Sequence, residues 1–362
     1  METIGKLKCA VLGATGVAGQ QFIIAADNHP WFEITGVYAS ERSAGRRYDM
    51  ACVWHDSSSI PSGVRALEVR DVRRIEDDLE SYDIIFSALG SENVKEIEGK
   101  CAAQKPVIST TSAFRMDQHV PIIIPEINAR HLALIDAQRA KKGWKGFVLP
   151  GPNCTTVGLA VSLKPIQDEF GILRVSMVSM QAISGAGYPG VSALDITGNV
   201  IPFIRNEEEK VQRESVKILG EPKEDWIRDA CFRISCTCTR VPVIDGHTEV
   251  VSVETEKPCD PELYKSAIRK FNERFRRRFG HLPSCPSESI VIKNEEDRPQ
   301  PRKDRDVNGG MSVCIGRIRR AEMFQHGLSY VVLSHNTKKG AAKGGIFVAE
   351  CLVDKGIVAM KR

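Results

Sequence analysis

The sequence predicts an α/β protein with an N-terminal, doubly wound parallel sheet and a C-terminal α+β domain on a largely antiparallel sheet. First, short apolar runs alternate with helix-like stretches over the first half of the chain, which is typical of parallel βαβ units. Second, the runs between about residues 172 and 335 are longer and alternate apolar with polar side chains, as antiparallel strands do. Third, a glycine-rich turn follows the first apolar run, where such folds pass from strand to helix.

The elements of the first half follow from short apolar runs bounded by turn residues. Residues 16–30 have apolar side chains at helical spacing and end at Pro30, so they predict the first helix. The apolar runs predict strands at residues 7–14, 32–40, 64–70, 82–90 and 105–112. Strands that alternate with helices in this way pair in parallel.

The longer runs of the second half predict strands at residues 173–184, 230–243, 247–256 and 310–320. Helical stretches separate them. One of these, residues 269–280, carries three phenylalanines at helical spacing among many arginines. We interpret it as an amphipathic helix with a solvated basic face; a phosphate-binding patch is the alternative. Residues 294–310 predict a polar loop or linker, and residues 341–356 a closing helix.

The composition is that of a globular protein and argues against several classes of function. The 362 residues carry a net charge of +4, with 42% hydrophobic and 27% charged residues, which favours neither a nucleic-acid nor a membrane partner. No apolar run approaches the roughly 18 residues that cross a bilayer, and the N-terminus has no signal-peptide pattern. Eleven cysteines without a C-x-x-C pair fit free thiols in a reducing compartment. We expect a cytoplasmic protein without a bound metal.

The glycine-rich turn at residues 13–19 has the form G-x-x-G-x-x-G and lies between the first strand and the first helix. Such a turn brings backbone N–H groups and a helix N-terminus up to a pyrophosphate, so we predict a Rossmann-like dinucleotide site. A glycine-rich turn without a ligand is the alternative, because the motif alone is weak. The predicted contacts in this turn are Gly13, Thr15, Gly16, Val17 and Gly19.

The choice of dinucleotide is predicted by the residues after the second strand. Glu41 lies at nearly the spacing of an acid that holds a ribose 2′-hydroxyl, which favours NAD. Ser40, Arg42 and Ser43 offer hydroxyls and a guanidinium to a 2′-phosphate, which favours NADP. We expect NADP, because several phosphate-directed donors stand against a single acid.

A candidate nucleophile, Cys154, lies at a corner between an apolar run and a helical stretch. The pattern after it predicts a helix that begins at this residue and is bent or ended by Pro165. Because helix dipoles stabilise a thiolate at a helix N-terminus, we expect a lowered thiol pKa. A small buried residue at a tight turn is the alternative.

A candidate base, His247, opens a strand after a predicted turn at Asp245 and Gly246. Arg240 precedes this turn, so we expect the imidazole and the guanidinium at one sheet edge, facing one cleft. The other histidines lie in predicted helix ends or polar loops and are poorer candidates. Gln181 ends another strand and enters a glycine-rich loop, which allows the backbone to approach a flat ring closely.

Seven motifs occur in one order along residues 6–358: the glycine turn, S-E-R-S, P-N-C-T-T, Q-A-I-S-G-A-G, E-E-E-K, an arginine seven residues before a histidine, and H-N-T-K-K-G-A-A. Together they resemble the aspartate-semialdehyde dehydrogenase family, in particular its fungal and archaeal branch. The resemblance implies NADPH-dependent reduction of 4-aspartyl phosphate to aspartate semialdehyde and phosphate through a cysteine thioester. This step belongs to lysine, methionine and threonine biosynthesis.

The resemblance also implies roles for single residues. Cys154 is the expected nucleophile, His247 the acid/base that takes the thiol proton, and Gln181 the residue that orients the acyl intermediate. The expected substrate contacts are Arg240 to the α-carboxylate, Glu207 to the α-ammonium, Lys210 and Arg115 to the phosphate, and Asn153 beside the nucleophile. The remaining expected cofactor contacts are Ser184, Gly185 and Asn336 near the nicotinamide and Ser87 near the adenosine. Apart from the resemblance, the E-E-E-K segment is typical of a solvated helix face.

The resemblance further implies two domains and an oligomer. We expect residues 1–153, completed by 336–362, to bind the cofactor, and residues 154–335 to form a catalytic and dimerisation domain. A homodimer is the expected minimum, and a tetramer the alternative. Two residues depart from the family pattern: Lys343 interrupts a glycine-rich stretch, which puts close helix packing there in doubt, and His335 replaces an aspartate common in bacterial relatives.

Two other readings stay open. Malonyl-coenzyme A or N-acetylglutamyl phosphate reductases share the architecture, but a malonyl group has no ammonium for Glu207. A dinucleotide-binding regulator needs no nucleophile, and the joint presence of Cys154, Gln181, Arg240 and His247 argues against it.

Overall fold

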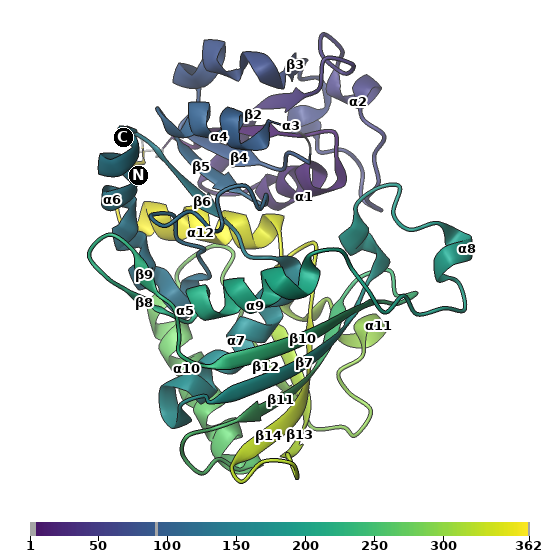
Figure 1. Ribbon diagram of the computed structural model, residues 1–362. Helices are drawn as coiled ribbons and strands as arrows, with labels where there is room; N and C mark the ends of the chain where they lie inside the picture. The colour runs from purple at the N-terminus through teal and green to yellow at the C-terminus, as the bar shows by residue number, and fades with distance from the viewer. Residues whose placement is uncertain (1–4, 91–92, 361–362) are drawn as a thin grey trace.

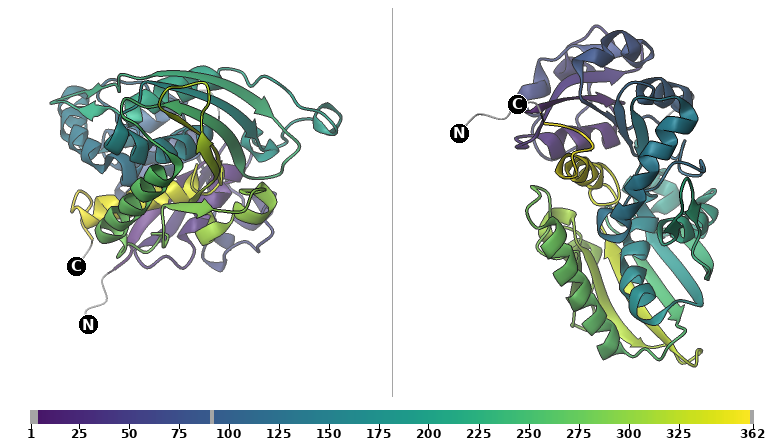
Figure 2. Two further views of the ribbon diagram at one scale, coloured as in Figure 1. Left: turned by 90° about the horizontal axis from the view of Figure 1, so that it is seen from below. Right: turned by 90° about the vertical axis from the view of Figure 1, so that its left-hand side faces the viewer.

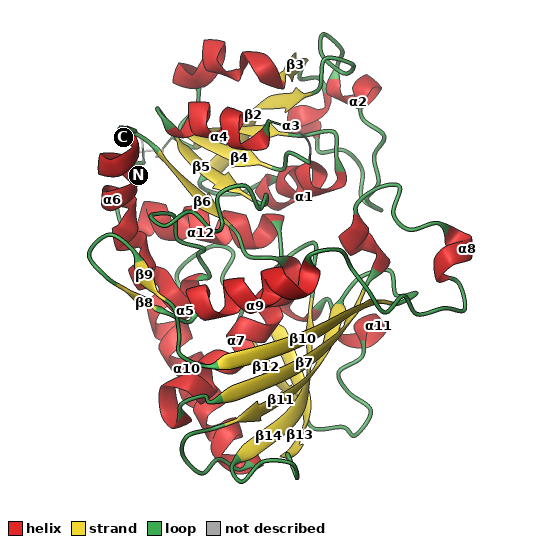
Figure 3. Cartoon of the chain, in the orientation of Figure 1, coloured by secondary structure: helices red, strands yellow, loops and turns green. Residues whose placement is uncertain are grey.

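The computed structural model describes residues 5–90 and 93–360. Figure 1 shows two lobes, each built on a six-stranded sheet, and Figure 3 shows how helices surround the first sheet. No helix in the described part of the chain is long and apolar enough to cross a membrane. The same residues contain no group of three or more metal-ligating side chains.

The first sheet is entirely parallel, with the strand order β3-β2-β1-β4-β5-β6. Its strands are β1 (Leu7–Leu12), β2 (Phe32–Ala39), β3 (Val69–Asp71), β4 (Ile84–Ser87), β5 (Pro106–Ser109) and β6 (Phe147–Pro150). The prediction of a doubly wound sheet is confirmed. The strand order reverses between β1 and β4, and ligands of such sheets bind at the carboxyl ends of the strands beside this point.

Helices cover both faces of the first sheet. On one face α1 (Val17–Ala26) and the predicted closing helix α12 (Ala342–Asp354) pack together in one apolar cluster. On the other face η1 (Val72–Ser81) and α4 (Val94–Ala102) pack on β1 and β4. The remaining helices of this region are α2 (Tyr48–Ala51), α3 (Ser62–Arg65), α5 (Pro125–Asn128), η2 (Ala129–Ala133) and α6 (Leu134–Lys142).

The second sheet has the order β10-β7-β11-β14-β13-β12. Its strands are β7 (Arg174–Gln181), β10 (Arg233–Arg240), β11 (His247–Glu254), β12 (Ile290–Lys293), β13 (Val313–Arg320) and β14 (Gly327–Ser334). The three central pairings are antiparallel, as predicted, whereas the two outer pairings, β10 with β7 and β13 with β12, are parallel. A short hairpin, β8 (Glu221–Pro222) and β9 (Ile227–Arg228), stands apart from this sheet.

Three long helices pack on one face of the second sheet: α7 (Cys154–Phe170), α9 (Glu207–Ile218) and α10 (Pro261–Phe279). The amphipathic helix is confirmed, since Phe271, Phe275 and Phe279 of α10 are buried. Helix α7 passes through Pro165 and continues to Phe170, so this proline, which the sequence predicts to bend or end the helix, does not end it. The short helices are η3 (Ile183–Ala186), α8 (Ala193–Ile196), α11 (Pro301–Asp304) and η4 (Val307–Gly310).

Helix α12 joins the two lobes. Figures 1 and 2 show it between the first sheet and the second lobe. Its Phe347 and Cys351 pack with Phe275 and Phe279 of α10, while its other face packs on α1. The lobes therefore share a continuous apolar contact beside the site described next.

Candidate active site

Cys154 is the first residue of α7, as the sequence predicted. Asn153 caps this helix, because its Oδ1 accepts hydrogen bonds from the backbone N–H groups of Thr155 (2.8 Å) and Thr156 (3.3 Å). The cap fixes the angle at which the chain leaves β6. The thiol is therefore held at the N-terminus of α7.

The sulfur of Cys154 lies 3.3 Å from Nε2 of His247, the residue that opens β11. The other ring nitrogen, Nδ1, accepts a hydrogen bond from the backbone N–H of Ala182 at 3.0 Å. A neutral ring in this position therefore carries its proton on Nε2 and directs it at the sulfur. Burial, followed by the positive charge of Arg240, lowers the pKa of His247 to about 3, so the ring is neutral at physiological pH.

Burial also raises the pKa of the Cys154 thiol to about 12, and the negative charge of Glu207 adds to this effect. The guanidinium groups of Arg115 and Arg240 act in the opposite direction. The predicted lowering of this pKa is therefore wrong in sign, because the prediction weighed the helix dipole and not the burial. The folded site holds a neutral thiol beside a neutral imidazole.

Two glycines allow the close approach around this pair. A Cβ on Gly185 would lie 2.9 Å from Nη1 of Arg240 and 3.1 Å from Nε2 of His247. A Cβ on Gly340 would lie 3.0 Å from Cα of Cys154. Larger residues at either position would displace the reacting groups.

A cleft of about 580 Å³ opens above the Cys154 thiol, between the two lobes. It contains the predicted nucleophile, all five predicted substrate contacts and some of the predicted cofactor contacts. Those that line it are Val17, Arg115, Asn153, Cys154, Ser184, Gly185, Glu207, Lys210, Arg240 and Asn336. His247 and Gln181 are buried behind this lining.

Charged groups of both signs face the cleft. Arg240 donates from Nη1 to the carbonyl oxygen of Ala182 at 2.7 Å, which fixes its guanidinium. Glu207 accepts from Nδ2 of Asn153 through Oε1 at 2.9 Å. Lys210 makes no ion pair with any residue that the structure describes. The lining of the cleft thus contains one acid, Glu207, and four cations, Arg115, Arg205, Lys210 and Arg240.

Arg115 is tied more firmly than expected. Its guanidinium donates to the carbonyl oxygens of Thr110, Gly151 and Pro152, and Nη1 pairs with Glu214 at 2.9 Å. Glu214 also accepts from the backbone N–H of Asn153 at 2.6 Å. Sequence reasoning missed Glu214, because a glutamate on an amphipathic helix gives no local signal. Arg115 therefore braces the nucleophile loop, with little donor capacity left for a phosphate.

The glycine turn has the expected geometry after β1. Gly13 adopts φ +75°, and a Cβ on it would lie 2.5 Å from the carbonyl oxygen of Ala88. A Cβ on Gly19 would lie 2.2 Å from the carbonyl oxygen of Gly13, so this glycine lets α1 start close to the strand. Thr15 and Gly16 complete the turn, and Val17 is the first helical residue. The exposed N-terminus of α1 fits a pyrophosphate.

Ser40, Arg42 and Ser43 form a turn after β2, outside the cleft lining. Glu41, the acid that favoured NAD, bonds Nη2 of Arg73 through Oε2 at 2.6 Å. Sequence reasoning missed Arg73, which lies in η1 and shares no motif with this turn. The arrangement leaves Arg42 as an exposed cation beside an acid that is already paired.

The remaining predicted cofactor residues lie in two places. Asn336 donates from Nδ2 to Oγ of Ser184 at 2.8 Å and accepts from the backbone N–H of Gly246 at 2.9 Å. This links two loops of the second lobe at the cleft. Ser87 ends β4, where it is buried beside the glycine turn.

Comparisons with known proteins agree with this arrangement. Residues 8–135 match the family model described as the semialdehyde dehydrogenase NAD-binding domain, and residues 163–339 match the semialdehyde dehydrogenase dimerisation domain. An aspartate-semialdehyde dehydrogenase of Archaeoglobus fulgidus is 45% identical over 96% of this chain and 98% of its own length. That of Trichophyton rubrum is 41% identical over 99% of this chain and all of its own length.

The chain belongs to the aspartate-semialdehyde dehydrogenase family. A crystal structure of the Candida albicans member, solved with NADP, has a TM-score of 0.88 and 36% identity, and covers 98% of this chain and 100% of its own. The predicted resemblance and its fungal and archaeal character are confirmed. The family model for the dimerisation domain also supports a homo-oligomer.

The structure shows the contacts of Lys343 and the burial of His335, the two residues that depart from the family pattern. Lys343 directs Nζ to the carbonyl oxygen of Gly309 at 3.3 Å. Close packing of α12 is provided instead by Gly345, where a Cβ would lie 2.9 Å from the ring of Phe22. His335 is buried, and burial lowers its pKa to about 4. Neither residue lines the cleft.

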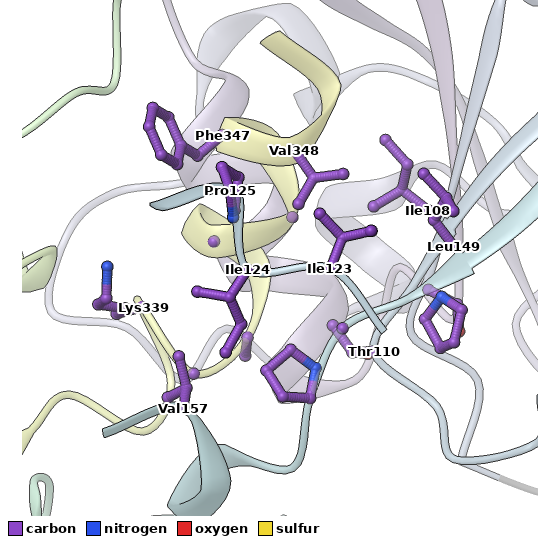
Figure 4. A pocket seen from close by; sticks show the side chains of 18 of the residues that line it. Ile108, Thr110, Ile123, Ile124, Pro125, Leu149, Val157, Lys339, Phe347 and Val348 are labelled. Carbon is purple, nitrogen blue, oxygen red and sulfur yellow. The ribbon is translucent and has the colours of Figure 1, made fainter. Parts of the chain in front are cut away.

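A second pocket lies behind the nucleophile loop of this family member (Figure 4). Its wall is mostly apolar and includes Ile123, Ile124 and Val348. It shares Pro152 and Gly340 with the wall of the main cleft. The loop that carries the nucleophile therefore stands between two hollow spaces and depends on its own hydrogen bonds for its position.

Proposed function

We propose that this protein reduces 4-aspartyl phosphate with NADPH to aspartate semialdehyde and phosphate, through a thioester on Cys154. The observation that carries the proposal is the 3.3 Å contact between the Cys154 sulfur and Nε2 of His247 at a helix N-terminus in the interlobe cleft. Family membership supports the same reaction.

In the first step the sulfur attacks the acyl carbon of the substrate, and the bond to the phosphate breaks. The thiol proton leaves with the phosphate as HPO₄²⁻, so this exchange consumes no external proton. The Nε2–H of His247 donates to the developing thiolate and lowers the cost of separating charge. The N-terminus of α7 acts in the same direction.

In the second step the thioester carbon accepts a hydride, which NADPH supplies when bound. The negative charge then moves to the former carbonyl oxygen, where the Nε2–H of His247 is placed to stabilise it by a hydrogen bond. Collapse of this oxyanion breaks the carbon–sulfur bond and releases the aldehyde and the Cys154 thiolate, which takes up one proton from solvent. We assign Gln181 to hold the acyl oxygen, since it lies in the row of β-sheet residues next to His247.

Substrate recognition follows from the charges in the cleft. Arg240 is assigned to the α-carboxylate, which matches its planar fork, and Glu207 to the α-ammonium. Lys210 is assigned to the phosphate, because it lines the cleft and makes no ion pair with any residue that the structure describes, and Asn153 positions Glu207. A malonyl group would leave Glu207 buried without a cation, which disfavours malonyl-coenzyme A.

The cofactor assignment rests on the first lobe. Gly13 and Gly19 have no room for a Cβ, so they bring the start of α1 close to the end of β1, and the N-terminus of α1 is assigned to the pyrophosphate. Ser40, Arg42 and Ser43 are assigned to the 2′-phosphate, with Glu41 neutralised by Arg73. A related structure solved with NADP supports NADP over NAD. Ser87, Ser184, Gly185 and Asn336 are assigned to the remainder of the cofactor.

We also propose a homodimer that works in the cytoplasm, with a tetramer as the alternative assembly. All eleven cysteines are free, which fits a reducing compartment. The proposed cofactor domain spans residues 1–153 and 336–362, because α12 packs on α1. Residues 154–335 then form the catalytic and dimerisation domain.

The test is an NADP-linked assay with aspartate semialdehyde and phosphate, run beside malonyl-coenzyme A. We expect turnover with the first pair alone, and an acyl adduct on Cys154 by mass spectrometry. Turnover with malonyl-coenzyme A and none with aspartate semialdehyde would overturn the substrate assignment.

A further inference from the structure

The carboxyl group of Glu249 is the most unusual buried group of the second lobe. Glu249 lies on β11, two residues after His247, and is 0% exposed. Neither carboxyl oxygen has a hydrogen-bond partner among the residues that the structure describes. The hydroxyl oxygen of the nearby Ser334 is also buried and also has no hydrogen-bond partner among these residues. A buried carboxyl without hydrogen-bond partners is energetically unfavourable, so we expect Glu249 to have a role that offsets this cost.

The sheet register places Glu249 directly beneath the active site. Arg240 pairs with Gln181, and His247 pairs with Ser334. Thr248 pairs with Met180, so Gln181 also stands beside His247. We call these four residues, Arg240, Gln181, His247 and Ser334, the upper row.

The next row on the same face lies two residues along each strand. Cys238 pairs with Ser179, and Ser179 pairs with Glu249. We call Cys238, Ser179 and Glu249 the lower row. All three are buried, so the row is a polar layer between the active site and the apolar core below.

Helix α7 confirms the position of Glu249 from the other side. Cys154 and Gly158 are one helical turn apart, a rise of about 6 Å, which matches the spacing of about 7 Å from His247 to Glu249 on the strand. A Cβ on Gly158 would lie 2.7 Å from Oγ of Ser334 and 3.4 Å from Oε1 of Glu249. As Cys154 faces His247, Gly158 thus faces Glu249 and Ser334.

Ser179 connects the two rows. Its Oγ accepts a hydrogen bond from Nε2 of Gln181 at 3.2 Å. The side chains of Ser179 and Glu249 are direct cross-strand neighbours, within reach of a hydrogen bond by a small rotation. If a group in the lower row accepts the hydroxyl proton of Ser179, the hydrogen bond from Gln181 to the Ser179 oxygen therefore becomes stronger.

The groups that face Glu249 make it a neutral acid. They are His247 on its own strand, Cys236 and Cys238 on β10, Ser179 on β7, Tyr330 and Ser334 on β14, and Gly158 on α7. None of these is a cation at neutral pH. Burial raises the pKa of Glu249 well above its usual range, so its carboxyl keeps a proton and can both donate and accept.

We propose that Glu249 is a positioning residue that fastens the upper row from below through hydrogen bonds to the Ser179 and Ser334 hydroxyls. The hydrogen bond to Ser179 fixes the position of Gln181, and the hydrogen bond to Ser334 fixes the end of β14 that pairs with His247. The inference rests on the roles proposed above for Gln181 and His247. The competing role is that the carboxyl of Glu249 stores a proton for the reaction. An amide at this position could replace the hydrogen bonds of a positioning residue, but it could not replace a carboxyl that gives up its proton.

The test compares Glu249→Gln with Glu249→Leu in steady-state kinetics. Glutamine keeps the shape, one donor and one acceptor, so we expect kcat within about threefold of the wild type and an unchanged pH profile. Leucine removes both, and loose positioning should lower kcat by about 10- to 100-fold with a smaller change in KM. Glu254→Gln, at the far end of β11, is the matched control and should have no effect.

Ser179→Ala gives a second measurement that leaves Glu249 intact. It should lower kcat in the same direction, and adding it to Glu249→Leu should lower kcat little further, because both changes break one chain of contacts. Thermal unfolding and NADPH binding of each variant show whether the fold survives. Additive losses would overturn the proposed link.

Two outcomes overturn the inference outright. If Glu249→Gln is as slow as Glu249→Leu, the carboxyl acts through its proton; if Glu249→Leu is as fast as the wild type, Glu249 positions nothing. Gln181→Ala separates this failure from that of the proposed function. A wild-type rate for Gln181→Ala would refute the assigned role of Gln181, whereas a slow Gln181→Ala with a fast Glu249→Leu refutes the inference alone.

Discussion

The cofactor end and the catalytic end of the cleft are built in opposite ways. The cofactor end is a backbone turn at the tip of one strand, within residues 13–19, and residues 40–42, which follow the neighbouring strand, are exposed. The catalytic end is a row of buried side chains from four strands, opposite a helix N-terminus, and its two reacting groups are 93 residues apart in sequence. One end depends on local conformation and the other on sheet register.

The difference extends to electrostatics. At the cofactor end the ion pair between Glu41 and Arg73 is exposed, so solvent and salt screen it. At the catalytic end burial decides the charge states, and both Cys154 and His247 are neutral. Substitutions should therefore change affinity at the first end and turnover at the second. The predictions below test this division.

The largest effect is expected at the nucleophile. Cys154→Ser should lower turnover by about 10⁴-fold or more, since loss of a covalent nucleophile removes the pathway. NADPH affinity, measured by fluorescence titration, should stay within about twofold. Cys231→Ser changes an exposed thiol and serves as the control. A variant that keeps a substantial fraction of activity would refute the thioester.

The next effect is expected at the histidine. His247→Asn should lower kcat by about 10²–10⁴-fold, the usual contribution of a positioned acid/base, with a smaller change in KM. Gly185→Ala should lower kcat in the same direction, because its Cβ would meet Arg240 and His247. Stopped-flow kinetics of both variants check this. Loss of NADPH affinity without loss of kcat would break the division between the two ends.

A third prediction concerns the cofactor end. Arg42→Ala should remove a charge-assisted contact of about 1.5–3 kcal/mol and weaken NADPH by about 10- to 150-fold, with NADH little affected. The kcat at saturating NADPH should stay near that of the wild type. Arg74→Ala, an exposed neighbour paired with Asp77, is the control. Equal losses for both cofactors would show that Arg42 does not bind the 2′-phosphate.

A fourth prediction concerns the thiol itself. Because burial raises the pKa of Cys154 to about 12, its alkylation rate should rise about tenfold per pH unit from pH 7 to 10, with no plateau near the ordinary thiol pKa. The exposed thiol of Cys231 gives the comparison. Peptide-resolved mass spectrometry measures both rates. A Cys154 plateau at or below pH 8 would show that the helix dipole outweighs burial.

The smallest effect is expected on stability. Burial lowers the pKa of His131 to about 4, so the unfolded chain binds a proton near pH 6.5 that the folded chain refuses. The free energy of unfolding should fall as the pH drops through this window, by about 1 kcal/mol from this group between pH 6 and 5. His131→Gln should flatten this part of the profile in urea unfolding. An unchanged slope would assign the loss to other groups, such as His247.

How far the sequence predicts the molecule follows the same division. The glycine turn, the helix that begins at Cys154 and the turn before His247 depend on neighbouring residues, and all three were predicted. Glu214, Arg73 and Glu249 were not, because each acts on a group far away in sequence. A local pattern carries no record of which strand lies beside which.

The errors have physical causes of the same kind. Helix α7 continues through Pro165 because packing against the sheet and two helices outweighs the lost backbone hydrogen bond. The thiol pKa was predicted with the wrong sign because burial is a property of the folded whole. The largely antiparallel second sheet is predicted correctly, but its parallel outer pairings depend on crossover connections that alternation of side chains does not reveal.

The C-terminal helix gives the chain an unusual path between its lobes. The chain crosses from the first lobe to the second between β6 and α7, and returns between β14 and α12. These crossings touch, since a Cβ on Gly340 would lie 3.0 Å from Cα of Cys154. Because the two crossings lie side by side at the nucleophile, we expect any opening of the lobes to rotate about them. In that case Cys154 would move less than the walls of the cleft around it.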